Sequence, residues 1–179
     1  ATKKAMDLIA AAVAKVSLHE ALDEKEVGVI PSVLVIGGGI AGIQASLDIA
    51  HSGFGVYLVE KSPTLGGHLA QIDRTFPNLE ESTSILLPKM EEVANHPLVH
   101  LLTNSEVEEV EGFVGNFKVR IKHGPRYVDP EKCNRCKKCE EVCPVKVPNE
   151  FNMGMEERKA IYLPCPNAIP FSYVIDSKN

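Results

Sequence analysis

The stretch SVLVIGGGIAGIQASLDIAHSGFGVYLVEK, residues 32–61, limits the possible folds more than any other part of the sequence. An apolar run at 33–36 leads through a glycine-rich turn into an Ala-rich segment at 41–50, and a second apolar run follows at 56–59. Short apolar runs bounded by turn residues are typical of buried strands, whereas the longer segment between them is typical of a helix. The order therefore predicts a β-α-β unit.

The glycines of the first turn follow the pattern G-x-G-x-x-G. Gly37 permits a tight turn, Gly39 lets the backbone approach a pyrophosphate, and Gly42 allows the helix to pack closely on the sheet. The helix N-terminus stabilises phosphate charge, and Glu60 at the end of the second strand can accept hydrogen bonds from ribose hydroxyls. An ordinary glycine turn is the alternative, but the strand, helix and acid all fall where dinucleotide binding needs them.

A second glycine pair, Gly66-Gly67, follows shortly after Glu60. Because glycine lacks a Cβ atom, such a pair can bring the backbone close to a second stretch of phosphate or ribose. This pair favours FAD over NAD as the dinucleotide.

Four cysteines stand in the segment CNRCKKCEEVCP, residues 133–144, at the spacing C-x2-C-x2-C-x3-C-P. Thiolates at this spacing can wrap a 4Fe-4S cluster, whereas zinc favours two C-x2-C pairs separated by a longer loop. We therefore predict a 4Fe-4S site. In two-cluster ferredoxins the fourth cysteine binds the other cluster, so the fourth ligand of this site is either Cys143 or Cys165, which is also followed by proline. The simpler interpretation of Cys165 is a small buried side chain.

Composition narrows the functional classes. The chain has 179 residues, 44% of them apolar, which suffices for one ordinary domain and a small appendage. Its net charge of -5, with scattered lysines and arginines, argues against nucleic-acid binding. Clustered cysteines favour a reducing cytoplasm, and no segment is long and apolar enough to span a membrane. No serine-histidine-acid triad or pair of carboxylates predicts a catalytic residue.

The chain divides into three predicted parts. Residues 1–30 form an N-terminal helix, at 3–22, and an acidic connector, because apolar residues recur there at helical spacing. Residues 31–125 form the dinucleotide-binding domain, and residues 126–179 form the iron-sulfur module, which includes the strand-like KAIYLP. Within the middle part we expect a short helix at 88–95, a parallel strand at 98–103, and a hairpin of 106–111 with 117–122.

The order of these blocks resembles the A subunit of heterodisulfide reductase. The similarity covers nearly the whole chain, from VLVIGGGIAGIQASLDIAHSGFGVYLVEK to RYVDPEKCNRCKKCEEVCPVKVPNEF and RKAIYLPCPNAIPFSYVID. In that family a thioredoxin-reductase-like FAD domain carries an inserted ferredoxin module. The resemblance thus implies an α/β fold: a Rossmann-like FAD-binding domain, incomplete here, with an inserted or appended bacterial-ferredoxin-like 4Fe-4S module.

The resemblance also implies site residues. The FAD site would consist of Gly37, Gly39, Gly42, Glu60, Lys61, Gly66, Gly67 and His68, with the backbone of Val107 facing the adenine. The cluster ligands would be Cys133, Cys136, Cys139 and Cys143.

The implied function is that of an oxidoreductase subunit that passes electrons between FAD and 4Fe-4S clusters, with flavin-based electron bifurcation as one use and methanogenesis as the setting. The implied partners are other redox subunits of such a complex, ferredoxin, and a hydrogenase or formate dehydrogenase. Two alternatives are a cluster-only ferredoxin-like carrier and an assembly subunit with a degenerate dinucleotide fold.

Two departures from the family pattern matter. Where the family has a D-C-S-x-C-type segment, this chain has Glu80-Glu81-Ser82-Thr83-Ser84, and carboxylates and hydroxyls replace thiolate ligands poorly. The second departure is length, because both modules are left open at YVIDSKN. Open sheet edges normally need cover, so we expect a fragment, a split or a truncated member, with another chain completing the flavin domain.

Overall fold

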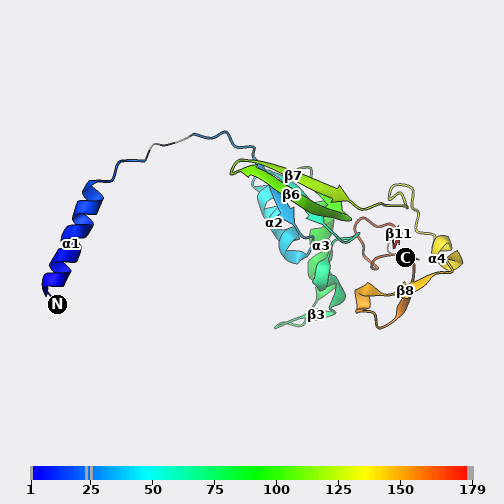
Figure 1. The fold of residues 1–179 in the computed structure, drawn as a ribbon. Helices are drawn as coiled ribbons and strands as arrows, with labels where there is room; N and C mark the ends of the chain where they lie inside the picture. Colours follow the sequence, from blue (N-terminus) through cyan, green and yellow to red (C-terminus); the bar gives the residue numbers. More distant parts are fainter. Residues whose placement is uncertain (1, 23, 25, 177–179) are drawn as a thin grey trace.

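The structure is a computed structural model that describes residues 2–22, 24 and 26–176. The predicted N-terminal part and iron-sulfur module include residues 1, 23, 25 and 177–179, which lie outside the described residues. A body built of a parallel sheet, two covering helices, a long hairpin and a region of short strands follows a helix that stands apart (Figure 1).

The predicted β-α-β unit is confirmed. It consists of β1 (Ser32–Ile36), α2 (Ile40–His51) and β2 (Gly55–Glu60), and β5 (Val99–Thr103) adds a third strand. The three strands are parallel in the order β1-β2-β5, as expected for the strand predicted at 98–103. Parallel strands end at the same edge, so the glycine turn after β1 and the acid at the end of β2 meet there.

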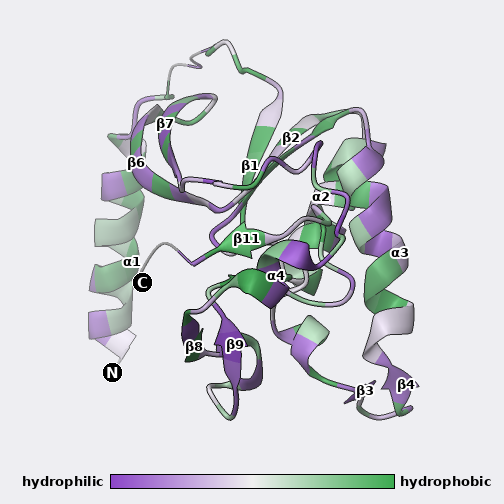
Figure 2. Cartoon of the chain, turned by 90° about the vertical axis from the view of Figure 1, so that its right-hand side faces the viewer, coloured by the Kyte–Doolittle hydropathy of each residue, from purple (hydrophilic) through white to green (hydrophobic). Residues whose placement is uncertain are grey.

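The core lies between this sheet and two helices, α2 and α3 (Ser82–Asn95). Its buried side chains come from both helices, from β2 and from the loop after β2: Ile43, Leu47, Leu58, Leu65, Leu86, Met90 and Val93. In Figure 2 β1 is apolar along most of its length, whereas α3 alternates between apolar and polar residues, as a helix with one buried side does. Leu65 belongs to this core, so the loop that carries the glycine pair is anchored in it.

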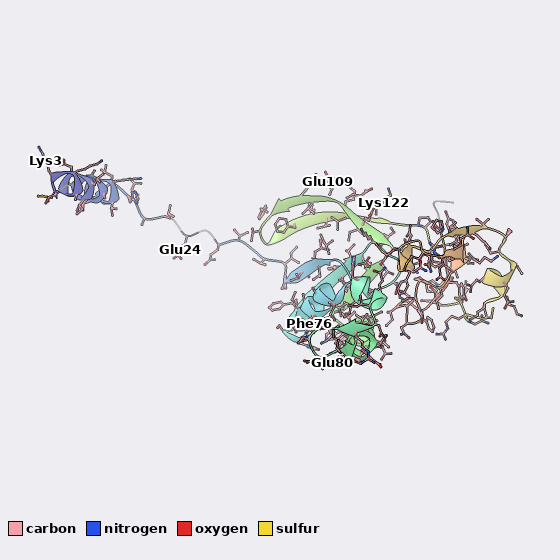
Figure 3. All side chains as sticks on the ribbon, turned by 90° about the horizontal axis from the view of Figure 1, so that it is seen from below. Lys3, Glu24, Phe76, Glu80, Glu109 and Lys122 are labelled. Atoms are coloured by element: carbon pink, nitrogen blue, oxygen red, sulfur yellow. The ribbon has the colours of Figure 1, made fainter. Side chains whose placement is uncertain are left out.

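The predicted hairpin is confirmed and is longer than expected, with β6 (Ser105–Phe113) paired antiparallel to β7 (Asn116–His123). Its register is irregular between Val107 and Glu109. The acidic side chains that the sequence places on a solvated face lie opposite basic ones: Arg120 Nη1 is 2.5 Å from Glu109 Oε2. Figure 3 shows Glu109 and Lys122 on this hairpin, away from Phe76 and Glu80 at the far side of the body.

Short elements complete the described body. Between β2 and α3 lie η1 (Gly67–Gln71), β3 (Arg74–Thr75) and β4 (Glu80–Glu81). The cysteine-containing region holds six elements: α4 (Lys138–Val142), β8 (Lys146–Pro148), η2 (Glu150–Asn152), β9 (Glu157–Lys159), β10 (Ile161–Tyr162) and β11 (Val174–Ile175). β8 pairs with β9 and β10 with β11, so the strand-like KAIYLP does contribute to strands, with a break at Ala160.

The prediction of the N-terminal helix at 3–22 is wrong at its end, because α1 (Thr2–Ser17) stops earlier. The N–H groups of Leu18 and His19 bond three residues back, to Lys15 and Val16, and this tighter pattern closes the last turn. All sixteen residues of α1 are described and none is buried, so tertiary packing does not extend the helix. Within the described residues, no helix is long and apolar enough to cross a bilayer.

The prediction of a helix at 88–95 is wrong at its start, since α3 begins at Ser82. Proline is common as the first helical residue, and the prediction places Pro88 there. In the structure Pro88 lies inside the helix and removes only the hydrogen bond that would reach the carbonyl of Ser84 in the first turn. Ser82 is 1% exposed, and its N–H donates to the carbonyl of Asp73 at 2.9 Å, which fixes the earlier start.

Candidate functional site: a glycine cradle beside a cysteine loop

The turn after β1 has the geometry that its glycines predict. Gly37 has φ +104, a left-handed value that favours glycine, and its N–H donates to the carbonyl of Val59 at 2.7 Å. A Cβ atom on Gly42 would lie 1.9 Å from the carbonyl oxygen of Gly37, so a larger residue would force the turn and α2 apart. At Gly37 and Gly39, by contrast, a Cβ would meet nothing within 4 Å.

Glu60 closes the opposite side of this turn. It is 8% exposed, and its Oε2 accepts a hydrogen bond of 2.5 Å from the N–H of Gly38. Its Oε1 accepts from both the N–H and the hydroxyl of Ser62, each at 2.6 Å. The carboxylate is therefore fixed at the strand end and still offers further lone pairs to ribose hydroxyls. Ser62 was not among the predicted site residues, because no motif marks it.

The second glycine pair lies against the first turn. Gly39 and Gly66 form an isolated parallel β-bridge, and the N–H of Gly66 donates to the carbonyl of Gly38 at 2.8 Å. A Cβ on Gly67 would lie 3.1 Å from the Cα of Gly39. Gly66 and Gly67 have φ values of +119 and +52, respectively. The φ of Gly66 favours glycine, and a side chain on Gly67 would press on the backbone of the first turn.

Two neighbouring hollows border this arrangement. One has a volume of about 710 Å³ and is bordered by the predicted flavin residues Gly37, Glu60, Lys61 and Val107. The other has a volume of about 390 Å³ and is bordered by Glu60, Lys61, Gly67 and His68. Gly39, Gly42 and Gly66 shape the turn itself. The structure thus brings the predicted flavin residues together around Glu60, although they come from four separate stretches of the sequence.

A dinucleotide fits these residues. Open space lies over Gly37 and Gly39 where a pyrophosphate would approach, and Gly39 is the N-cap of α2, whose first N–H groups face an approaching anion. The fixed carboxylate at the end of β2 lies where a ribose would be bound.

The cysteine loop, residues 133–139, turns sharply. Arg135 and Lys137 have left-handed φ values of 59 and 63, and Lys137 is the N-cap of α4. All five cysteines of the chain lie within the described residues, and each is a free thiol. Four thiols at this spacing are a donor set that suits a soft metal centre.

The thiols do not form a closed cage. Among the described residues, no three His, Cys, Asp or Glu side chains gather closely enough to hold a metal ion. Because ligands close around a metal as it binds, we expect the cysteine loop to tighten when a cluster is inserted.

Cys143 and Cys165 have opposite environments. A backbone hydrogen bond at Ile161 lowers the pKa of the Cys143 thiol, and a smaller effect of burial opposes it. The Sγ atom also donates to the carbonyl of Val145 at 3.7 Å. Cys165 is 7% exposed, and burial raises the pKa of its thiol. The buried position of Cys165 is what the packing interpretation predicts.

The stretch that departs from the family pattern has a structural role. The hydroxyl of Ser82 donates to the carbonyl of Ile72, and the hydroxyl of Ser84 donates to the carbonyl of Glu81 at 2.7 Å. Ser82 and Ser84 therefore hold the start of α3. Of the two positions where the resemblance predicts cysteines, one is Ser84 and the other is Glu81, the N-cap of the helix.

Family models match both halves of this arrangement. Residues 32–136 match the model of FAD dependent oxidoreductases, and residues 126–149 match the 4Fe-4S binding domain. The first match covers the glycine turn, Glu60 and the glycine pair, and the second covers all four cysteines of the motif.

Three curated relatives illustrate the sequence similarity. An iron-sulfur A subunit of CoB-CoM heterodisulfide reductase from Methanopyrus kandleri is 54% identical over 98% of this chain and 26% of its own length. The A subunit of H(2):CoB-CoM heterodisulfide,ferredoxin reductase from Methanothermobacter marburgensis is 51% identical over 98% of this chain and 27% of its own length. The A subunit of H(2)/formate:CoB-CoM heterodisulfide,ferredoxin reductase from Methanococcus maripaludis is 47% identical over 98% of this chain and 27% of its own length. The chain spans about a quarter of the length of these relatives.

Proposed function

Because the chain belongs to the FAD dependent oxidoreductase family and, over 98% of its length, to the group of heterodisulfide reductase A subunits, we propose that it passes electrons between FAD and a 4Fe-4S cluster. The observation that carries this proposal is the bridge between Gly39 and Gly66 beside the fixed carboxylate of Glu60. The glycine turn, the glycine pair and Glu60 together form a dinucleotide-binding site, here called the dinucleotide cradle, in the same chain as a four-cysteine motif. FAD and a 4Fe-4S cluster are the cofactors that the matching family models indicate.

The chain's own residues would bind and orient these groups. Gly37, Gly39 and Gly42 would receive the pyrophosphate, Glu60 would accept from the ribose, and the remaining flavin contacts would come from Lys61, Gly66, Gly67, His68 and Val107. The cluster would be held by Cys133, Cys136 and Cys139, with Cys143 or Cys165 as a further ligand. When bound, a flavin exchanges one or two electrons and a cluster exchanges one, so the chain needs no acid, base or nucleophile of its own.

Cys143 is the better candidate for that further ligand. Backbone hydrogen bonding, chiefly at Ile161, lowers the pKa of its thiol and favours the thiolate, which is the form that binds metal. Cys165 is buried and its neutral thiol is favoured.

The names of the relatives support a proposal for the partners of this chain. These names mention ferredoxin, H(2), formate and the CoB-CoM heterodisulfide. By analogy, this chain would act inside a heterodisulfide-reductase-like complex, with other redox subunits, ferredoxin, and a hydrogenase or formate dehydrogenase as electron partners. We propose a methanogenic and cytoplasmic setting, with electron bifurcation as one use of such a chain.

An anaerobic titration with dithionite tests the proposal. We expect bleaching of flavin absorbance and the appearance of the electron paramagnetic resonance signal of a reduced 4Fe-4S cluster in one sample of the protein. A cluster signal without flavin would overturn the proposal in favour of a cluster-only carrier. A protein that holds neither flavin nor cluster, yet still assembles with the other subunits of its complex, would favour an assembly role.

A further inference from the structure

One short segment, residues 169–173, connects the two candidate cofactor sites. At its start, the N–H of Ile169 donates to Oγ1 of Thr64 at 2.8 Å, and the N–H of Leu65 donates to the carbonyl of Ile169 at 3.0 Å. Thr64 and Leu65 directly precede the glycine pair, so this bridge segment is tied to the flavin side of the molecule.

The other end of the bridge segment contacts the cysteine motif at two points. The guanidinium carbon of Arg135 lies 4.2 Å from the centre of the Phe171 ring, a cation–π contact. The hydroxyl of Tyr173 donates to Oε2 of Glu140 at 2.7 Å. Arg135 lies between the first two cysteines of the motif, and Glu140 directly follows the third.

Tyr173 is the buried member of these contacts. It is 2% exposed, whereas Glu140 is only partly buried, so the segment supplies a fixed donor to a more exposed acceptor. Burial raises the pKa of Tyr173 above the ordinary tyrosine value, and the hydrogen bond to Glu140 and the charges of Cys139 and Cys133 add to the rise. The phenol therefore keeps its proton and can donate to Glu140.

We infer that Tyr173 is a positioning residue for the cluster site: through its hydrogen bond to Glu140 it holds the cysteine loop in place from a segment anchored beside the flavin site. The inference rests on the proposed function, since it names a residue that serves the same cluster. A charge-assisted hydrogen bond from a buried donor restricts opening of the loop, and a loop that opens less often releases its metal more slowly.

The test compares release of iron from anaerobically purified protein to a ferrous chelator. We expect Tyr173→Phe to release iron about tenfold faster than the parent protein, because the ring stays and only the hydrogen bond is lost. The matched control is Tyr127→Phe, since Tyr127 is 62% exposed in the same region and should release iron at the parent rate. Flavin content should be unchanged in both variants. Equal release from Tyr173→Phe and the parent protein would overturn the inference.

A second pair of variants separates positioning from loss of fold. Glu140→Gln keeps an acceptor for the tyrosine hydroxyl and should release iron at close to the parent rate, whereas Glu140→Ala should match Tyr173→Phe. The double variant Tyr173→Phe with Glu140→Ala should be no faster than either single one, because both remove the same hydrogen bond. Additive effects would contradict the inference.

The inference and the proposed function can fail separately. If the parent protein held no iron at all, the cluster assignment would fail. Alkylation of Cys139 in the metal-free protein would then test Tyr173 alone, and we expect about tenfold faster labelling in Tyr173→Phe. Unchanged labelling would overturn the positioning role.

Discussion

The N–H of Gly38 donates a hydrogen bond of 2.5 Å to Oε2 of Glu60, so the middle of the glycine turn is joined directly to the end of β2. The other carboxylate oxygen accepts two hydrogen bonds from Ser62, which begins the loop toward the glycine pair. A single buried side chain thus holds three segments of the dinucleotide cradle. Its loss should affect folding as well as flavin binding.

We expect Glu60→Ala to lower the free energy of unfolding by about 2 kcal/mol, because it leaves the N–H of Gly38 and the Ser62 donors without their acceptor. Flavin content should fall in the same variant. Glu111→Ala is the control, since Glu111 is exposed on β6 and its loss should cost less than about 0.5 kcal/mol. Urea unfolding measures both values. Equal stability of the two variants would contradict the structural role of Glu60.

Two glycines of one motif should respond differently to alanine. In Gly42→Ala the new Cβ would meet the carbonyl of Gly37 at 1.9 Å, so we expect a loss of about 1–3 kcal/mol of stability. In Gly39→Ala the Cβ enters open space, so the fold should remain within about 1 kcal/mol of the parent protein while the flavin is lost. Thermal unfolding and flavin absorbance separate the two outcomes. Equal destabilisation by both changes would mean that the open space above Gly39 is not where the dinucleotide binds.

The glycine motif and the hairpin could be predicted because their signals are local. Apolar runs, glycines and an acid at fixed offsets lie within residues 32–61, and the physical reason for each is contained in that stretch. The start of α3 was not predictable in this way. The helix begins at Ser82 because the carbonyl of Asp73 accepts a hydrogen bond from its N–H and because its side chain is buried. Neither Asp73 nor the surrounding core lies next to Ser82 in the sequence.

The contacts that connect the two sites could not be predicted. Thr64 and Ile169 are 105 residues apart, and Tyr173 and Glu140 are 33 apart. Neither pair belongs to a motif, and hydrogen bonds between residues so distant in sequence depend on how the chain folds back. The sequence predicts that each glycine stretch approaches the dinucleotide, but it does not predict that the two stretches contact each other, as Gly39 and Gly66 do.

Thiol reactivity should follow the opposite pKa directions of two cysteines. Hydrogen bonding from Ile161 lowers the pKa of Cys143, so its thiolate is populated at a lower pH than in an ordinary thiol, whose pKa is about 8.5. Burial raises the pKa of Cys165, so its thiolate should appear only at higher pH. Alkylation of the metal-free protein from about pH 6 to 10, followed by mass spectrometry, should label Cys143 first. In urea, where the fold is lost, the two thiols should react at the same pH. If Cys143 were still labelled before Cys165 in urea, the order would come from the reagent and the prediction would be contradicted.

The cluster assignment predicts an effect of a single ligand. We expect Cys136→Ser to lose most of the iron and sulfide while flavin content stays near the parent value, because a hydroxyl is a poor ligand for iron in a cluster. Cys136 is exposed, so the substitution itself should leave the stability of the metal-free protein nearly unchanged. Iron, sulfide and flavin analysis of one preparation decides the outcome. Equal loss of iron and flavin would show that the two parts of the chain fold as one unit.

The central claim is that one chain holds a flavin cradle and a cluster site. The most direct measurement is anaerobic purification followed by quantitation of iron, sulfide, zinc and flavin per chain. We predict about four irons with matching sulfide and one FAD, in a brown protein that bleaches in air. A colourless protein with stoichiometric zinc and without flavin would contradict the account.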